Sequence, residues 1–175
     1  MSIPFPGEYR LERLQKSHPR RGFDCGQGLV NDWVRTKALQ HQEKRLSVTK
    51  VLIDSTDLLA GFYTLATGQI DFGDLPTELV RQLPRRALPV AVLAWLGVHR
   101  SLHGQGLGDR LLASSLRDCY DAGQTFAFVA VILDCVDDAA KSYYTRWDFS
   151  ELPGNPYRLF LSASTLAAMM QSSKG

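Results

Sequence analysis

The chain has 175 residues, and its 45% share of hydrophobic residues is enough to bury the core of one globular domain over residues 1–175. No apolar run approaches the ~20 residues that cross a bilayer, and the first residues lack the build of a signal peptide, so we expect a cytoplasmic protein. Three scattered cysteines exclude a disulfide framework and a C-x-x-C metal site, so we expect reduced thiols and no metal.

The net charge of +2 hides an uneven distribution of charged side chains. The first 50 residues hold ten of the 20 Lys and Arg against five acids, whereas residues 51–75 carry four acids and no Lys or Arg. A polyanionic partner suits such a polarised surface, and its affinity would depend on salt. From composition alone, a solvated helix face is the better interpretation.

The first half of the chain predicts an edge strand, a long helix, a hairpin and a short helix, over residues 9–14, 27–44, 47–54 with 58–66, and 76–83. The long helix is expected to bury one face, which carries Leu29, Val30, Trp33, Val34 and Ala38.

The second half begins with a strand over residues 89–98 that we expect to be buried on both faces, because it is β-branched and almost uncharged. A helix from residue 107 and a second apolar strand over 126–133 follow. A right-handed crossover would place these two strands parallel and adjacent. We expect a helix, two closing strands, a terminal helix and a disordered end over residues 137–144, 149–152, 157–162, 162–170 and 171–175. The order of these strands and helices along the chain predicts an α/β fold with a mixed sheet.

The helix after the first buried strand presents one apolar face, formed by Leu107, Leu111, Leu112, Ser115, Leu116 and Cys119. Glycines at 104, 106 and 108 lie in the turn that leads into it, where they can adopt positive φ and leave the backbone open to a ligand. Such a helix N-terminus attracts anions. The turn is not a dinucleotide fingerprint, because Asp109 and Leu111 stand where glycines are required, and no Gly-Lys-Ser/Thr of a P-loop follows. Taken alone, a flexible capping turn is the commoner interpretation.

Two stretches carry a resemblance to a known family. Residues 103–108 are similar to the Arg/Gln-x-x-Gly-x-Gly/Ala acyl-CoA loop of the GNAT superfamily of N-acetyltransferases, and residues 139–149 resemble its A-x-x-F-Y-x-x-x-G-F signature. The stretches Phe-Asp-Cys-Gly at 23–26 and Gly-Phe-Tyr-Thr-Leu at 61–65 resemble the corresponding stretches of the bacterial GNAT toxins that acetylate aminoacyl-tRNA. The resemblance implies a GNAT-like fold with a central mixed sheet flanked by helices. Asp24 is expected either to cap the first long helix or to act within its loop.

The resemblance also implies acetyl-CoA as the cofactor. Its pantetheine arm would bond the backbone near Leu96 and Val98, and the amides of residues 104–109 would hold its pyrophosphate. The implied cofactor-binding residues are Leu96, Gly97, Val98, His103, Gly104, Gln105, Gly106, Leu107, Gly108, Asp109 and Asp137.

Tyr144 is the implied general acid, which would protonate the departing thiolate, while Tyr143 is expected to point elsewhere and join the core. No general base stands out. The ordinary pKa of an α-amino group is about 7.7 to 8.0 against about 10.4 for lysine, so a useful neutral fraction exists without a strong base. Asp137, His99 and Glu151 are candidate helpers, but a cap or a surface role is favoured for each.

If the substrate is an aminoacyl-tRNA, the surplus of basic residues could bind its phosphates. The expected substrate or tRNA contacts are Arg20, Arg21, Lys37, Arg45, Arg81, Arg85, Arg86 and Trp95. A ribbon-helix-helix antitoxin and a second copy of the chain are further expected partners.

The sequence departs from the family pattern at four positions. His103 replaces Arg or Gln, Trp95 replaces Arg, His99 replaces Asp, and Asp148 replaces a glycine that can require positive φ, which Asp tolerates. Two other functions stay open. One is an ordinary GNAT enzyme that acetylates a small amine, a peptide or a protein N-terminus, and the other is a catalytically silent acyl-CoA-binding module.

Overall fold

The computed structural model describes residues 3–172. In this part of the chain, one mixed sheet has the strand order β1-β2-β3-β4-β5-β7-β6. The strands are β1 (Arg10–Arg13), β2 (Val48–Ile53), β3 (Leu59–Asp71), β4 (Ala87–Val98), β5 (Ala130–Asp134), β6 (Ser150–Leu152) and β7 (Asn155–Ser162). The helices are α1 (Gly28–Asp32), α2 (Ala38–Glu43), α3 (Thr77–Val80), α4 (Leu107–Gly123), α5 (Asp138–Thr145) and α6 (Ala163–Gln171). A π-helix, η1 (Trp33–Lys37), joins α1 to α2, and two 3-10 turns are η2 (Phe72–Asp74) and η3 (Arg100–Leu102). The expected α/β class with a mixed sheet is confirmed.

The described chain divides into two compact units. The first contains the described residues up to Ala66 together with Leu93–Arg117. The second contains Thr67–Val92 and the described residues from Asp118 onward. Each unit is discontinuous in the sequence, and β3, β4 and α4 each contribute residues to both. The single domain expected from the chain length stays a prediction.

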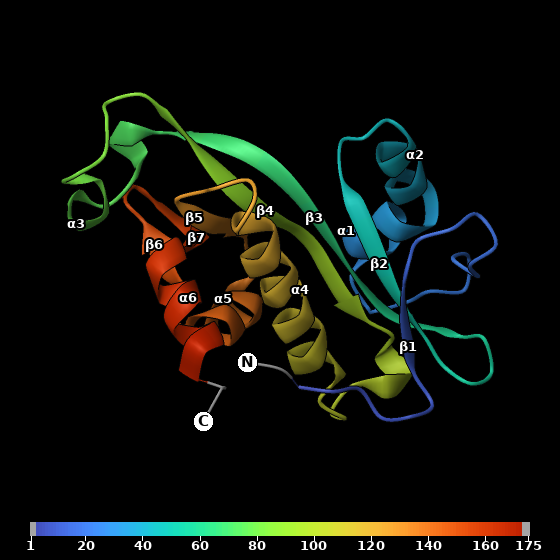
Figure 1. Ribbon diagram of the computed structural model, residues 1–175. Helices are drawn as coiled ribbons and strands as arrows, with labels where there is room; N and C mark the ends of the chain where they lie inside the picture. The colour runs from blue at the N-terminus through green and yellow to red at the C-terminus, as the bar shows by residue number, and fades with distance from the viewer. Residues whose placement is uncertain (1–2, 173–175) are drawn as a thin grey trace. The chain divides into compact units, whose positions relative to one another are not determined.

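The first unit is built on the antiparallel strands β1, β2 and the beginning of β3. Arg10 pairs with Ile53 at the edge, and Val48 pairs with Leu65, so the predicted edge strand and hairpin are confirmed. The helical run α1-η1-α2 covers these strands, and α2 contacts β2 (Figure 1). Its buried face is the predicted one except at Leu29, which is 70% exposed. Leu29 lies in the first turn of a short helix at the surface, where the sheet does not cover it.

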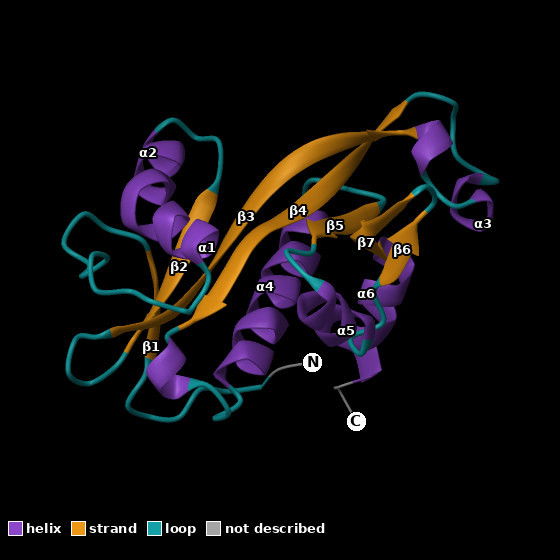
Figure 2. Cartoon of the chain, turned by 180° about the vertical axis from the view of Figure 1, so that it is seen from behind, coloured by secondary structure: helices purple, strands orange, loops and turns teal. Residues whose placement is uncertain are grey.

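The second unit contains the parallel pair that the crossover predicted. β4 and β5 pair in parallel over three residues, from Val90 with Ala130 to Val92 with Ile132. β7 then pairs antiparallel with both β5 and β6. Helices α5 and α6 both contact β7 and lie side by side (Figure 2).

Two predicted features of the second half are wrong in part. β5 begins at Ala130 and not at 126, because the N–H groups of Thr125 and Phe126 bond the carbonyl of Ala122 and continue the end of α4 as a turn. Phe126 is accordingly 79% exposed. β4 is not buried on both faces, because its residues alternate between buried and exposed over 87–90, as in a strand with one covered face.

The predicted core face of α4 is confirmed, since each of its six members is buried. The terminal helix α6 reaches Gln171, which was expected to be disordered. Residues 173–175 lie outside the described part of the chain. All three cysteines are free thiols, as expected. Over residues 3–172, no helix has both the length and the hydropathy of a membrane span.

Candidate functional site

The glycine turn has the backbone that the sequence predicts. Gly104 and Gly106 adopt φ values of +81° and +77°, the left-handed region that favours glycine. Gly108 already lies within α4 and needs no such freedom. Residues 103–106 are exposed, and they lead directly into the first turn of this 17-residue helix. The first N–H groups of a helix have no helical partner and carry partial positive charge, so this turn can hold a phosphate.

The space around the turn fits that role. A Cβ at Gly104 would meet nothing within 4 Å, so a ligand can approach this backbone directly. A Cβ at Gly106 would lie 2.7 Å from Nη1 of Arg110, so the two residues are in close contact. Among the predicted cofactor contacts, Gln105 and Asp109 are exposed beside the turn, and Leu107 is buried and anchors the helix start.

The end of β4 is packed against the helical run of the first unit. Gly97 is buried, and a Cβ there would lie 2.9 Å from Val30 and 3.3 Å from Phe23. The absent side chain of this glycine therefore makes room for core side chains. Trp95 stacks on Trp33 with 5.3 Å between ring centroids and 12° between ring planes.

His103 reaches back to β4. Its Nε2 lies 2.8 Å from the carbonyl oxygen of Val98, to which it donates as the Nε2–H tautomer. This carbonyl is one of the groups at which the resemblance places the pantetheine arm. The histidine therefore has an intramolecular partner, whereas the Arg or Gln usual at this position would add its own donors to the turn.

The loop over residues 23–26 contacts Arg100, which lies just before the glycine turn. Asp24 accepts hydrogen bonds at Oδ1 from the Gly26 N–H and from Asn31 Nδ2, at 2.9 and 3.0 Å. These bonds keep the pKa of its carboxyl below the usual value. Its Oδ2 pairs with Nε of Arg100 at 3.2 Å, and its backbone carbonyl accepts from the Arg100 N–H at 2.8 Å. Asp24 thus acts within the loop and not as the cap of α1, which is Gln27.

Structural partners explain all three candidate bases, and the partner of Asp137 is described below. Nδ1 of His99 accepts from the Ser101 N–H at 3.2 Å and caps η3. Glu151 pairs with Nζ of Lys141. These contacts support the cap and surface roles that the sequence analysis favoured.

Tyr144 lies in the last turn of α5, in the second unit. It is half-buried, and its ring meets Phe149 edge-on at 5.8 Å. Burial raises the pKa of its phenol well above the ordinary value of 10.0, so the group stays protonated and can donate. Asp148 has the positive φ that was anticipated, +68°. Tyr143 is only partly buried and carries Arg146 over its ring at 5.8 Å, so the expectation of a core residue is wrong.

Asp137 is the N-cap of α5. Its carboxylate accepts from the Ala140 N–H at 2.8 Å. The cap explains this residue without a ligand, and a carboxylate is a poor neighbour for a phosphate. The cofactor-binding role assigned to Asp137 gains no support from these contacts.

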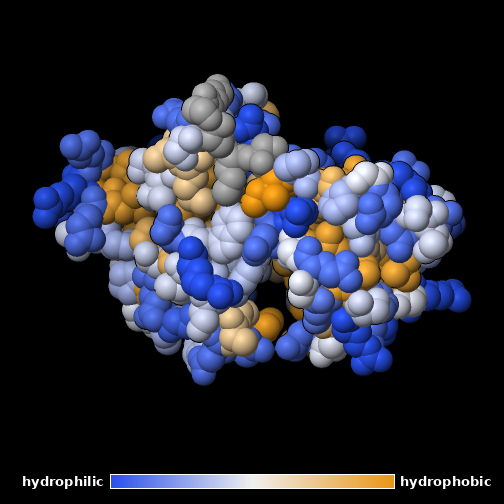
Figure 3. Space-filling view, turned by 90° about the horizontal axis from the view of Figure 1, so that it is seen from below, coloured by the Kyte–Doolittle hydropathy of each residue, from blue (hydrophilic) through white to orange (hydrophobic). Residues whose placement is uncertain are grey.

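The predicted tRNA contacts are divided between the units. Arg20, which is half-buried, and the exposed Arg21, Lys37 and Arg45 belong to the first unit. Arg81, Arg85 and Arg86, all exposed, belong to the second, and the Arg85 guanidinium lies 5.7 Å from the centre of the Phe72 ring. The face shown in Figure 3 is largely hydrophilic, with apolar patches between polar side chains.

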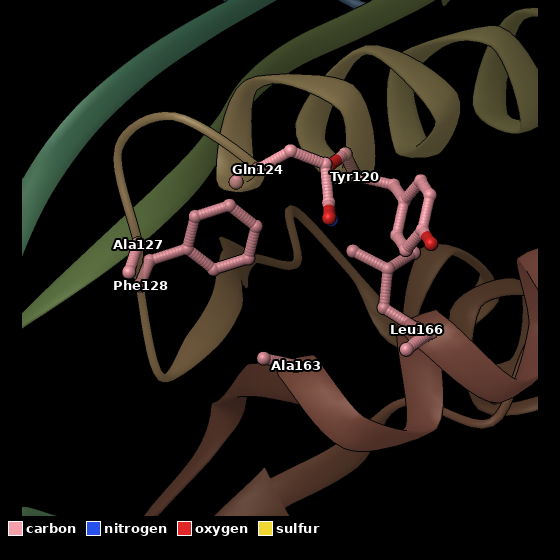
Figure 4. A pocket seen from close by; sticks show the side chains of 8 residues that line it. Tyr120, Gln124, Ala127, Phe128, Ala163 and Leu166 are labelled. Atoms are coloured by element: carbon pink, nitrogen blue, oxygen red, sulfur yellow. The ribbon is translucent and has the colours of Figure 1, made fainter.

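The sequence analysis missed two features of the structure. The side chain of Arg110 donates a hydrogen bond to the Gly106 carbonyl in the glycine turn. In the sequence, only its position four residues after Gly106 indicates this contact. A small pocket of about 90 Å³ lies in the second unit between the end of α4 and the start of α6 (Figure 4). It is lined by Tyr120, Gly123, Gln124, Ala127, Phe128, Ala163, Leu166 and Ala167. Ligand pockets usually measure about 300 Å³ or more, so this one is too small for a coenzyme.

No protein-family model matches the chain. Its sequence is similar to a tRNA-acetylating toxin of Mycobacterium tuberculosis, with 28% identity over 159 residues that cover 90% of this chain and 94% of the relative. It is also similar to a probable toxin TacT of Sinorhizobium fredii, with 27% identity over 162 residues that cover 87% and 90% of the two chains.

Solved structures of such toxins share the fold. AtaT complexed with acetyl-methionyl-tRNAfMet superposes with a TM-score of 0.85 at 22% identity, covering 93% of this chain and 99% of that one. AtaTR bound with AcCoA gives 0.82 at 22% identity, covering 93% and 98%. The KacTA–DNA complex gives 0.77 at 22% identity, covering 94% and 99%. The expected GNAT-like fold and the resemblance to the tRNA-acetylating toxins are confirmed.

Proposed function

We propose that this chain is a cytoplasmic N-acetyltransferase toxin that moves the acetyl group of acetyl-CoA to the α-amino group of an aminoacyl-tRNA, and that an antitoxin neutralises it. The observation that carries the proposal is the left-handed glycine turn at the start of α4, in a chain that resembles a tRNA-acetylating toxin over 90% of its length. AtaT, with the same fold, was solved with acetyl-methionyl-tRNAfMet, and AtaTR with AcCoA. An AtaT mutant toxin, also of this fold, was solved bound to the C-terminus of the antitoxin AtaR, and this complex motivates the proposed antitoxin.

The glycine turn is the proposed pyrophosphate site. Backbone N–H groups of residues 104–109 would donate to the anion, and Gly104 lets it approach without meeting a side chain. Leu96, Gly97 and Val98 would line the pantetheine arm, with the Val98 carbonyl shared with His103. Bound acetyl-CoA supplies a thioester, which is an activated acetyl group.

Tyr144 is the proposed general acid. Its phenol stays protonated because burial raises its pKa, so it can give a proton to the thiolate that leaves when the C–S bond breaks. The new C–N bond forms from the neutral α-amine, which releases its proton to solvent. A strong protein base is unnecessary, since an α-amine with a pKa of about 7.7 to 8.0 is partly neutral at physiological pH.

Trp95 is the proposed contact for the acceptor. Trp33 covers one face of its indole and is itself fixed by a 2.9 Å hydrogen bond from Nε1 to Thr64. The half-buried Trp95 can present only its other face and its edges to a ligand. The basic residues named above would contact tRNA phosphates.

The experiment that tests the function is incubation of the protein with labelled acetyl-CoA and a charged total tRNA pool. We expect label on the amino acid of one or more tRNA species, which mass spectrometry after deacylation identifies. Label on free amines or on protein N-termini, with none on charged tRNA, would overturn the proposed acceptor. CoA release without any labelled acceptor would exclude transferase activity.

The basic pair Arg85 and Arg86 gives a prediction about the tRNA surface. Replacement of both by Gln should raise the KM for aminoacyl-tRNA. The slope of log KM against log salt concentration should fall by about one to two, because up to two phosphate contacts disappear. The KM for acetyl-CoA is the internal control and should not change. An unchanged KM for tRNA across the salt range would exclude the pair from the tRNA surface.

A further inference from the structure

Arg110 is fixed under the glycine turn by two hydrogen bonds to backbone carbonyls. Its Nη1 donates to the Gly106 oxygen at 3.1 Å, and its Nε donates to the Pro4 oxygen at 2.9 Å. The side chain is half-buried, in the first turn of α4. Since both acceptors are neutral carbonyls, these bonds orient the guanidinium without cancelling its charge, which arginine keeps at any physiological pH.

The Gly106 carbonyl receives two donors from this one residue. The backbone N–H of Arg110 also bonds it, at 3.3 Å, as the first helical hydrogen bond of α4. The carbonyl belongs to the same planar peptide as the Leu107 N–H, which points in the opposite direction. A charged donor on the carbonyl polarises the peptide and strengthens its N–H as a donor. Arg110 therefore acts on one of the amides that would face a pyrophosphate bound at the turn.

The left-handed φ of +77° explains why residue 106 is a glycine, and the guanidinium of Arg110 uses the space beside it. A Cβ there would lie 2.7 Å from Nη1, so the guanidinium packs directly against the glycine and would have to move if a side chain were added. This brings a permanent positive charge next to the turn. His103, which stands where the family pattern has Arg or Gln, instead bonds the Val98 carbonyl.

We propose that Arg110 is a positioning residue for the pyrophosphate of acetyl-CoA, acting by polarising the Gly106–Leu107 peptide and by its fixed charge. The inference rests on the cofactor of the proposed function but is independent of the acceptor.

The test measures binding of CoA by calorimetry, without an acceptor and without turnover. Arg110→Gln removes the charge and should weaken CoA binding about tenfold, which corresponds to about 1.4 kcal/mol. Arg110→Lys keeps a positive charge but loses the planar guanidinium and its two differently placed N–H donors. Its affinity for CoA should lie between that of Arg110→Gln and that of the unmodified protein. Arg117→Gln on the same helix is the control for net charge, and its affinity should not change.

Two further readouts separate this role from a purely structural one. The loss in Arg110→Gln should persist with 3′-dephospho-CoA, which keeps the pyrophosphate, and the salt dependence of binding should become flatter. Equal affinity of Arg110→Gln and the unmodified protein, an equal loss in Arg117→Gln, or a loss that vanishes with 3′-dephospho-CoA would each overturn the inference. If the unmodified protein binds no CoA at all, the proposed function itself fails.

Discussion

Two helices of this protein begin in opposite ways. α5 begins at an aspartate whose own carboxylate accepts the Ala140 N–H, and Asp138 adds a second acid in its first turn. α4 begins after two left-handed glycines, which have no side chain to place on the first N–H groups. Both helix starts carry the same partial positive charge. A side chain therefore caps the start of α5, whereas we propose that the start of α4 receives an external anion.

The contrast separates two roles that a helix start can have. A side-chain cap stabilises the fold and occupies the amides, whereas a glycine turn gives up that stabilisation and exposes them. It follows that α5 should contribute to the reaction through its last turn, where Tyr144 lies, and not through its first turn. α4 should contribute through its first turn.

The largest effect is expected at the last turn of α5. Tyr144→Phe removes the proposed proton donor while leaving the edge contact with Phe149, so kcat should fall by about 10² to 10⁴ with little change in the KM for acetyl-CoA. Steady-state kinetics on charged tRNA measure both constants, and thermal unfolding should match that of the unmodified protein.

The pH profile sharpens the same prediction. Because burial raises the pKa of this phenol above 10.0, the proton is retained as the pH rises from about 7 to about 9. We expect kcat of the unmodified protein not to decline over that interval. A kcat for Tyr144→Phe within twofold of the unmodified value would remove Tyr144 from the mechanism.

The next effect is expected at the open helix start. Gly106→Ala places a Cβ at φ +77° and 2.7 Å from Arg110, where the left-handed backbone alone costs about 1 to 2 kcal/mol. We expect the turn to shift and the KM for acetyl-CoA to rise about tenfold. Gly154→Ala is the matched control, because Gly154 has φ +75° in the turn between β6 and β7 with nothing within 4 Å of a Cβ. It should lose similar stability without a change in KM, and equal KM values for both variants would argue against the pyrophosphate site.

The open start could be predicted from the sequence because its signals are local. A buried strand, glycines at fixed spacing and an amphipathic helix follow one another within about 30 residues, and each has its own pattern. Tyr144 could be placed because it lies within a family signature. The contacts that support the turn could not be predicted. Arg100 and Asp24 are 76 positions apart in the chain, and the partner of Arg110 at Pro4 is 106 positions away, so only the folded backbone brings them together.

Exposure was the other feature that local patterns could not supply. Leu29 and Phe126 are apolar and lie in apolar stretches, yet both are exposed because the elements around them end or turn away from the core. Asp137 shows the same limit in a functional residue. The sequence placed it among the cofactor contacts and also favoured a cap or a surface role over a catalytic one, and the geometry shows that its carboxylate caps its own helix.

The smallest effect is therefore predicted for Asp137. Asp137→Ala removes the acceptor of the Ala140 N–H, and loss of such a cap costs about 0.5 to 2 kcal/mol of stability. Denaturant unfolding should show that loss, while CoA affinity and kcat at saturating substrates stay within twofold of the unmodified values. Asp137→Ser, which restores a capping oxygen without the charge, should recover most of the stability. If Asp137→Ala instead weakens CoA binding tenfold with unchanged stability, then α5 also meets the cofactor through its first turn, and the division of roles between the two helix starts is wrong.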